Sequence, residues 1–204
     1  MEGQEYLNQI SASNRPEKKS MNRFFSSKFF IFAAISAVIL IAIMILGAII
    51  NGSKGDEKEL NYKLKLHIDN TAKVIQNYQP LVKSSVLRSS SASLSSILSN
   101  TSRELNDYLV EKYNFKDKDV DKKIVEAATA KKDELETELF EAKINGILDR
   151  IYAHKMTYEI SSIMGEEAKL INSSKNAGLK DLLTTSYQSL DNLYKNFSEF
   201  SETK

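Results

Sequence analysis

A run of 22 residues without a single charge, Phe29 to Ile50, limits most strongly what this chain can become, and Ser36 is its only polar side chain. As an α-helix the run would be about 33 Å long, which is enough to cross a hydrocarbon core of about 30 Å. It lacks the alternation of a strand and exceeds the length of an ordinary core helix. The sequence therefore predicts a transmembrane helix over residues 29–50.

A cleavable signal peptide is the main alternative for this run. Signal peptides have apolar cores of about 7–15 residues followed by a cleavage site of small residues. Here the core is longer, and Gly47 to Asn51 offer no such site. A lipoprotein anchor needs a cysteine, and the chain has none. We therefore expect an uncleaved anchor in the lipid bilayer.

The charges that flank the anchor predict its orientation. Five lysines and arginines precede it, and three of them lie within ten residues of Phe29. Lysine and arginine favour the cytoplasmic side of a membrane. Residues 1–28 are polar, contain Pro16, and are predicted to form a short disordered cytoplasmic tail. The protein is thus expected to be a single-pass protein of the plasma membrane with its C-terminal domain outside.

The region after the anchor is predicted to be helical. Residues 51–55, NGSKG, have the composition of a flexible linker, and residues 56–204 are long enough for one domain with its own core. Two prolines and seven glycines in the whole chain favour long helices. Apolar residues recur every three or four positions in segments joined by short loops. We predict an all-α fold, a single N-terminal transmembrane helix followed by an up-and-down bundle of four to five amphipathic helices.

Breakers and apolar spacing delimit the first two helices of this bundle. The first is expected to start near Asp56 and to end or kink at Pro80. Residues 84–102 hold ten serines in nineteen positions, yet their leucines keep a helical period. A second helix is therefore predicted from about Leu81 or Ser85 to Lys112. Its small residues would allow close packing against a neighbouring helix.

The second half of the domain has one ambiguous junction. Asp117 and Asp119 are predicted to cap a helix whose apolar stripe starts at Val120. The stripe changes phase beside Asn145-Gly146, and a kinked helix over 118–171 is favoured over a turn because no polar gap interrupts the apolar residues. Residues 172–178 are expected to form a loop before a last helix.

No residue is predicted to be catalytic, to bind a cofactor or to hold a metal. His67 and His154 are the only histidines, and neither has a carboxylate three or four residues away in a metal-binding arrangement. An aspartate-rich start of a calcium loop fails at Lys122, where glycine is needed, and at Ala128, where a bidentate glutamate is needed. The chain has no cysteine nucleophile and no phosphate-binding glycine loop, so an enzyme is not expected.

Charge excludes nucleic acid as a partner. The net charge is +1, and residues 1–28 hold five basic and three acidic groups, which leaves −1 for the remainder. A nearly neutral domain lacks the basic stripe that phosphate binding requires. Abundant lysine, isoleucine, asparagine and serine without tryptophan are typical of an AT-rich bacterial genome.

Three functional hypotheses follow. The first is an anchored helical bundle that binds another envelope protein, as a scaffold or adaptor of unknown partner. The second is a solute-binding or sensory bundle with a cavity lined by groups such as His67, Tyr108 or Tyr158. The third is a coiled-coil envelope-spanning or lysis protein, which would form a rod-like dimer. Ala33 and Ala37 form a small-xxx-small pair that favours weak homo-oligomerisation.

Overall fold

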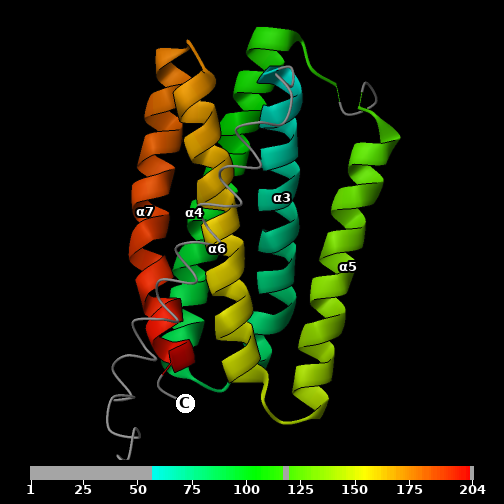
Figure 1. The fold of residues 1–204 in the computed structure, drawn as a ribbon, viewed down its shortest axis with the longest axis vertical. Coiled ribbons are helices and arrows are strands. Elements are labelled where there is room, and N and C mark those ends of the chain that lie inside the picture. The colour runs from blue at the N-terminus through cyan, green and yellow to red at the C-terminus, as the bar shows by residue number, and fades with distance from the viewer. Residues whose placement is uncertain (1–56, 117–119, 203–204) are drawn as a thin grey trace, which may run out of the picture. The chain divides into compact units, whose positions relative to one another are not determined.

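The computed structural model describes residues 57–116 and 120–202, and all of the secondary structure in these two ranges is helical (Figure 1). Five α-helices are present there, together with one short 3-10 helix. Their bounds are α3 Glu57–Tyr78, η1 Gln79–Leu81, α4 Ser85–Tyr113, α5 Lys122–Ile144, α6 Leu148–Ser173 and α7 Ala177–Glu202. Successive helices run up and down with short connections, so the predicted all-helical bundle is confirmed for this part of the chain.

The predicted anchor cannot be compared with these helices. None of the helices in the two described ranges is long and apolar enough to span a membrane. The transmembrane prediction falls on residues 29–50, which lie outside those ranges, as do the predicted tail 1–28 and linker 51–55. The anchor, the tail and the orientation therefore remain predictions from the sequence.

The boundary between the first two helices follows the predicted signals. Helix α3 ends at Tyr78, and Pro80 lies in the η1 turn because proline cannot continue the backbone ladder. Ser84 then caps α4, with its hydroxyl accepting from the amide of Leu87. The serine-rich segment is helical, as predicted, and α4 ends at Tyr113, one residue after the predicted Lys112.

The junction at Asn145-Gly146 is a turn, so the predicted continuous helix over 118–171 is wrong. Gly146 has φ +72°, a conformation that costs glycine little. Its amide donates to the carbonyl of Lys143 at 3.1 Å, and the amide of Ile147 donates to that of Ala142 at 2.9 Å. This pair of bonds is a Schellman motif, which ends a helix within three residues and needs no polar gap.

Two further boundaries differ from the predictions. The N-cap of α5 is Asp121, whose carboxylate accepts from the amide of Lys123 at 2.9 Å; the predicted caps, Asp117 and Asp119, lie outside the described ranges. The loop between α6 and α7 spans only residues 174–176, shorter than the predicted 172–178. Asn176 caps α7 by accepting from the amide of Leu179 at 2.9 Å.

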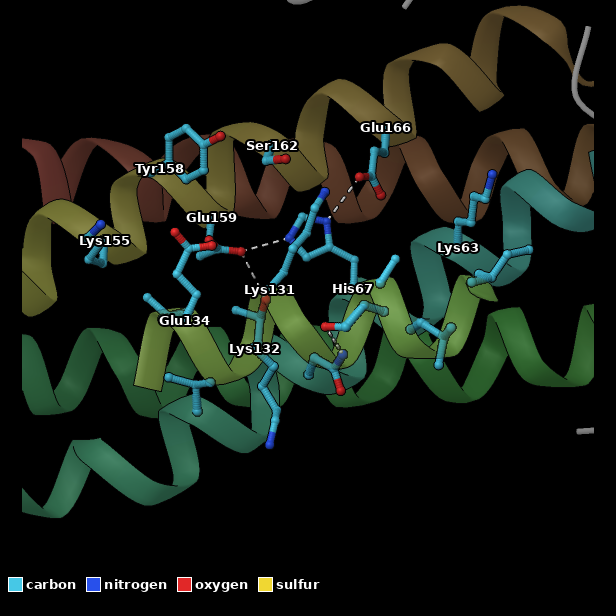
Figure 2. Close-up of a pocket in the computed structure, with 18 of the residues that line it drawn as sticks. Lys63, His67, Lys131, Lys132, Glu134, Lys155, Tyr158, Glu159, Ser162 and Glu166 are labelled. Carbon is cyan, nitrogen blue, oxygen red and sulfur yellow. Dashed lines mark hydrogen bonds and ion pairs between the residues drawn. The ribbon is translucent and has the colours of Figure 1, made fainter. Parts of the chain in front are cut away.

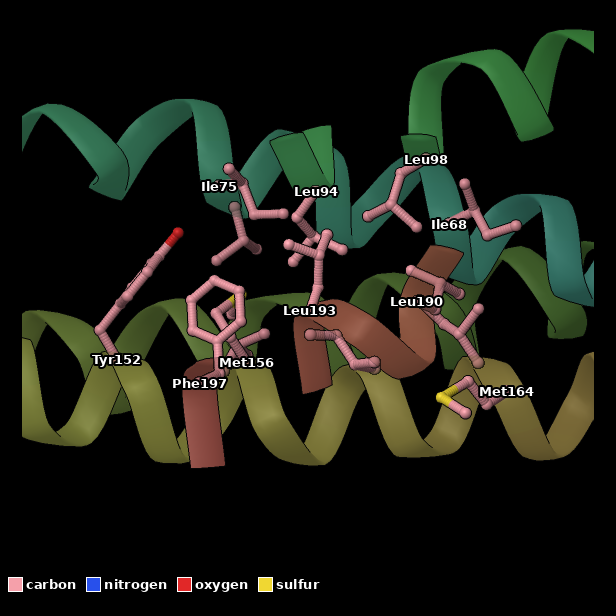
Figure 3. Packing of buried hydrophobic residues seen from close by; sticks show 14 of the residues in the cluster. Ile68, Ile75, Leu94, Leu98, Tyr152, Met156, Met164, Leu190, Leu193 and Phe197 are labelled. Carbon is pink, nitrogen blue, oxygen red and sulfur yellow. The ribbon is translucent and has the colours of Figure 1, made fainter. Parts of the chain in front are cut away.

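One hydrophobic core joins all five α-helices, and most of its residues come from α3, α4, α6 and α7 (Figure 3). Leu64, Ile68 and Ile75 of α3 are fully buried. Buried side chains face them from the other three helices. Prominent among these are Leu94, Leu98, Tyr152, Met156, Leu190 and Phe197. Each fully buried aliphatic or aromatic side chain contributes about 1.5–3 kcal/mol relative to exposure, so this core is the main stabilising element.

Helix α5 takes a different place from the others. It lies beside α3 and α6 (Figure 1) and enters the core only with its C-terminal half. Its only buried residues are Leu135, Leu139 and Ala142, all in its C-terminal half. At its other end, Ile124 packs on a small separate cluster built around Tyr62 and Phe115. Helix α5 is therefore held at two places, with a loosely packed stretch between them.

Candidate functional site

A cleft of about 720 Å³ lies between α3, α5 and α6 (Figure 2). Its apolar walls come from Leu66 and Val74 on α3 and from Ile124, Ala128 and Leu135 on α5. Polar side chains of α6 complete it. These are Lys155, Tyr158, Glu159, Ser162 and Glu166. Ligand sites of proteins typically have about 300–1,000 Å³ and combine apolar walls with a few polar groups, so this is the candidate functional site.

The cleft exists because α5 carries small residues between its two attachment points. From Ile124 to Leu135 the positions that turn toward α3 and α6 hold Ala127, Ala128 and Lys131. Alanine is too short to fill the space that leucine fills at Leu135 and Leu139. One hydrogen bond, from the Asn70 amide to the Ala128 carbonyl at 3.1 Å, ties this stretch to α3.

His67 of α3 is clamped between two carboxylates of α6 (Figure 2). Its Nε2 lies 2.7 Å from Glu159 Oε2, and its Nδ1 lies 3.1 Å from Glu166 Oε1. Glu159 and Glu166 are seven residues apart, which places them on one face of α6. Thr71 Oγ1 also donates to Glu159 Oε2, at 3.4 Å. The clamp fixes one wall of the cleft.

The clamp holds His67 in its charged form. Burial by itself lowers the pKa of the imidazole, but the hydrogen bonds to Glu159 and Glu166, and their charges, raise that pKa to about 9. As an imidazolium, His67 donates from both ring nitrogens and meets both carboxylates. Its single positive charge at pH 7 therefore faces two carboxylates.

The rim of the cleft holds more cations than anions. Lys155 pairs with Glu138 across α6 and α5, and Lys132 pairs with Asp133 at 3.0 Å and with Glu136. Lys63 pairs with Glu59 on its own helix. Within the described ranges, two further lysines and one glutamate that line the cleft have no oppositely charged group within ion-pair distance. These are Lys123, Lys131 and Glu134.

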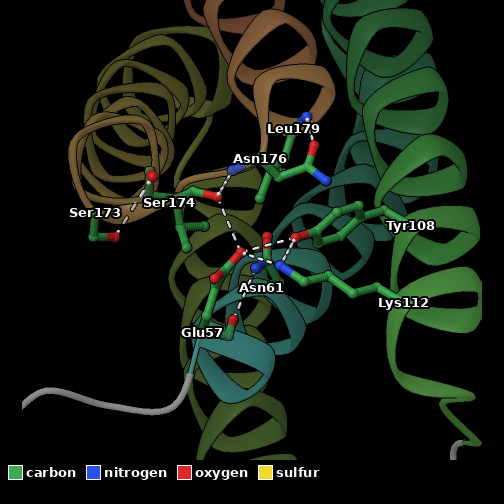
Figure 4. A network of polar contacts seen from close by, with 9 residues as sticks. Glu57, Asn61, Tyr108, Lys112, Ser173, Ser174, Asn176 and Leu179 are labelled. Atoms are coloured by element: carbon green, nitrogen blue, oxygen red, sulfur yellow. Dashed lines mark hydrogen bonds and ion pairs between the residues drawn. The ribbon is translucent and has the colours of Figure 1, made fainter.

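A second polar network joins three parts of the bundle at the end where α3 begins (Figure 4). Glu57 Oε1 accepts from Tyr108 OH at 2.8 Å, from Lys112 Nζ at 3.0 Å and from Ser174 Oγ at 3.0 Å. Burial raises the pKa of the Glu57 carboxyl, but these hydrogen bonds outweigh it and leave that pKa lowered. Burial, together with Glu57, raises the pKa of Tyr108 to about 12. Each of these four side chains has a partner, so the network holds α3, α4 and the α6–α7 loop together.

Glu167 is the most unusual ionisable group of the described chain. It is fully buried between α6 and its neighbours, and neither carboxyl oxygen makes a hydrogen bond within normal distance limits. Burial raises the pKa of this carboxyl to about 8, with Ser186 opposing the rise and Glu166 adding to it. At pH 7 Glu167 is therefore predominantly a neutral acid in the core.

The structure brings together only some of the residues named from the sequence. His67 and Tyr158 both line the cleft, while Tyr108 belongs to the Glu57 network at the end of the bundle. His154 does not line the cleft. The sequence did not single out Glu159 and Glu166, because they are 92 and 99 residues from His67. In the described ranges, no group of three or more histidine or acidic residues is arranged to hold a metal ion.

Comparison of the chain with protein-family models, with curated proteins and with solved structures finds no match.

Proposed function

We propose that this protein is a membrane-tethered binding protein whose helical domain holds a small ligand in the cleft between α3, α5 and α6. The cleft carries the proposal, because its volume of about 720 Å³ and its mixed walls are those of a ligand site. The anchor over residues 29–50 and its predicted orientation support a role outside the plasma membrane, as a solute-binding or sensory bundle.

The His67 clamp supports the same proposal. Ligand sites need polar groups whose positions are set before binding, because ordering them on binding costs affinity. His67 is fixed by Glu159 and Glu166 from the opposite wall. The alanine stretch of α5 faces this fixed wall, so the space is not closed by leucine packing.

A fluorescence titration tests the proposal directly. The chain has no tryptophan, so Tyr158→Trp places a single reporter at the rim of the cleft. Full-length protein in phosphatidylcholine nanodiscs is titrated with octanoate, octylammonium and octanol. We expect a saturable change in tryptophan fluorescence with at least one probe. This change should be lost when Ala128→Phe fills the cleft. The matched control is Val86→Trp on α4, an exposed site outside the cleft. Equal responses at both tryptophans would count against a specific site.

Binding of another protein is a second candidate function. Phe140, Ile144 and Ile147 are 54%, 69% and 40% exposed at the α5–α6 turn. Phe140 and Ile144 are four residues apart on α5 and so share one face of that helix, and Ile147 follows them in the turn. An exposed apolar group of this kind favours an envelope scaffold or adaptor. A photo-cross-linker at Ile144, compared with one at Lys143, tests it in intact cells; recovery of the same adducts from both positions would argue against a specific partner.

A further inference from the structure

We propose that the ligand of the α3–α5–α6 cleft is an organic amine, an ammonium group with hydrogen-bond donors on a short apolar body. This inference rests on the proposed binding function and adds the chemical class of the ligand. It follows from the balance of charge around the cleft, from the carboxylate oxygens that remain without a donor, and from the position of the apolar walls.

The charge around the cleft is negative once ion-pair partners are counted. Among the described residues, six cations line the cleft: Lys63, His67, Lys123, Lys131, Lys132 and Lys155. The carboxylates that line the cleft or pair with these cations number seven: Glu59, Asp133, Glu134, Glu136, Glu138, Glu159 and Glu166. Six against seven leaves a net charge of −1, so a ligand that restores neutrality carries a positive charge.

The surplus arises where one cation meets two carboxylates. His67 lies between Glu159 and Glu166, and Lys132 likewise pairs with two carboxylates. In the His67 clamp all three side chains are partly shielded from water, with exposures of 22% for His67, 16% for Glu159 and 36% for Glu166. A charge in such a place acts more strongly on a bound ligand than a charge surrounded by water.

The unpaired charges of the rim have less weight. Lys123, Lys131 and Glu134 are all exposed. Water and salt weaken the interactions of exposed charges. The second carboxylate of the His67 clamp therefore dominates the potential that a ligand in the cleft meets.

The carboxylates of the clamp also have acceptor capacity left. Glu166 Oε2 is buried and accepts no hydrogen bond from the described residues. Glu159 uses its Oε2 for both His67 and Thr71, and its Oε1 has no donor in the described ranges. Both ring nitrogens of His67 are already bonded. A buried acceptor without a donor is unfavourable, so this wall is suited to a ligand that donates hydrogen bonds, as an ammonium group does.

The apolar walls face the same space as the clamp. Leu66 and Val74 come from α3, and Ile124, Ala128 and Leu135 come from α5. A cleft of about 720 Å³ accommodates a single short alkyl or aryl body. Such a body would cover the alanine stretch of α5 while its ammonium group meets the carboxylates of α6 (Figure 2).

The test uses full-length Tyr158→Trp protein in phosphatidylcholine nanodiscs, with empty nanodiscs to correct for partitioning of the probes. Octylammonium carries the proposed group. Octyltrimethylammonium keeps the charge but has no donor, octanol is neutral, and octanoate reverses the charge. We expect saturable binding of octylammonium, severalfold tighter than that of the other three probes, and a severalfold loss of its affinity between 20 and 300 mM NaCl.

Lysine variants give the sign of the charge effect. Lys123→Gln with Lys131→Gln should strengthen octylammonium binding by about threefold, because two like charges leave the exposed rim. The control pair, Lys122→Gln with Lys143→Gln, removes the same charge from exposed positions of α5 that do not line the cleft, and it should leave the affinity unchanged. A loss of affinity in the first pair, or no difference between the pairs, would overturn the proposal.

A glutamate variant tests the clamp itself. Glu166→Gln removes the carboxylate with the unpaired oxygen and should weaken octylammonium binding by about tenfold, while its amide oxygen can still accept from His67. The control, Glu126→Gln, removes an exposed carboxylate of α5 that does not line the cleft and should leave the affinity unchanged. Equal affinities in the two variants would contradict the proposal.

The outcomes separate the ligand class from the function. If any of the other three probes binds at least as tightly as octylammonium and Ala128→Phe abolishes this binding, the cleft is a site but its ligand is not a hydrogen-bonding amine. If no probe gives a response that depends on Ala128, the binding function itself is wrong. Circular dichroism of each variant establishes that it keeps its helices.

Discussion

The buried Glu167 carboxyl should make the domain less stable as the pH rises, and Glu167→Gln should remove that effect. The pKa of Glu167 rises from 4.5 to about 8 on folding. Between these values the folded protein binds a proton that the unfolded chain does not, so the free energy of unfolding falls by about 1.4 kcal/mol per pH unit.

In a window from pH 5 to pH 6.5 this group dominates the slope. His67, whose pKa is 6.5 unfolded and about 9 folded, stays protonated in the folded chain and loses its proton only in part in the unfolded chain, which adds about 0.4 kcal/mol. Over this window of 1.5 units, Glu167 should lower the free energy of unfolding by about 2 kcal/mol. Glutamine has the shape of the neutral acid and does not titrate, so the variant should lose most of this slope.

Urea denaturation of the full-length protein, followed by far-ultraviolet circular dichroism at several pH values, measures the slope. The matched control is Glu134→Gln, an exposed glutamate of α5 that should keep the wild-type slope. An unchanged slope in Glu167→Gln would refute the reasoning, because it would mean that the carboxyl ionises normally in the folded protein.

Two further changes test other parts of the structure. The stabilisation from His67 is fully present below pH 6.5 and is lost as the pH rises through about 9. In the Glu167→Gln background we expect the free energy of unfolding to fall by about 2 kcal/mol over this range, a value that allows for the partial exposure of His67. His67→Gln should abolish this fall. Gly146→Ala should destabilise the folded domain by about 1 kcal/mol, because the position has φ +72°; no atom lies within 4 Å of the new methyl group, so the cost is conformational only. The control, Gly165→Ala at an open helical site, should not destabilise the domain. Thermal melts compare the two variants.

Much of the helical framework could be predicted because its signals are local. Pro80 ends α3 through its missing amide hydrogen, and Ser84 caps α4 through its hydroxyl. The serine-rich segment is helical because Leu87, Leu94 and Leu98 keep the helical period and are fully buried. Local chemistry and burial agree at these positions, so the sequence is sufficient to predict the helices there.

The α5–α6 turn shows where a local signal was outweighed. Asn145-Gly146 is a helix-ending signal, but the unbroken apolar residues favoured a kink. The structure leaves Ile144 69% exposed, so the apolar pattern there does not mark a core. A Schellman turn ends the helix through backbone hydrogen bonds and one glycine, so it leaves no polar gap in the apolar pattern.

The site could not be derived in the same way, because it depends on which helices pack together. His67 meets Glu159 and Glu166 only through the pairing of α3 with α6. A partial signal was present. Glu167 continues the stripe of Ile160, Ile163 and Met164, so the helical period alone places an acid among core positions.

The Glu57 network has a consequence for force transmitted along the chain. Helix α3 begins at Glu57, whose carboxylate is bonded to α4 through Tyr108 and Lys112 and to the α6–α7 loop through Ser174. A pull on the preceding chain would thus be shared by three parts of the bundle within the first turn of α3. His67 lies ten residues further along the same helix. If residues 29–50 anchor the chain as the sequence predicts, the network would spread tension from the anchor over these three parts before it reached the cleft.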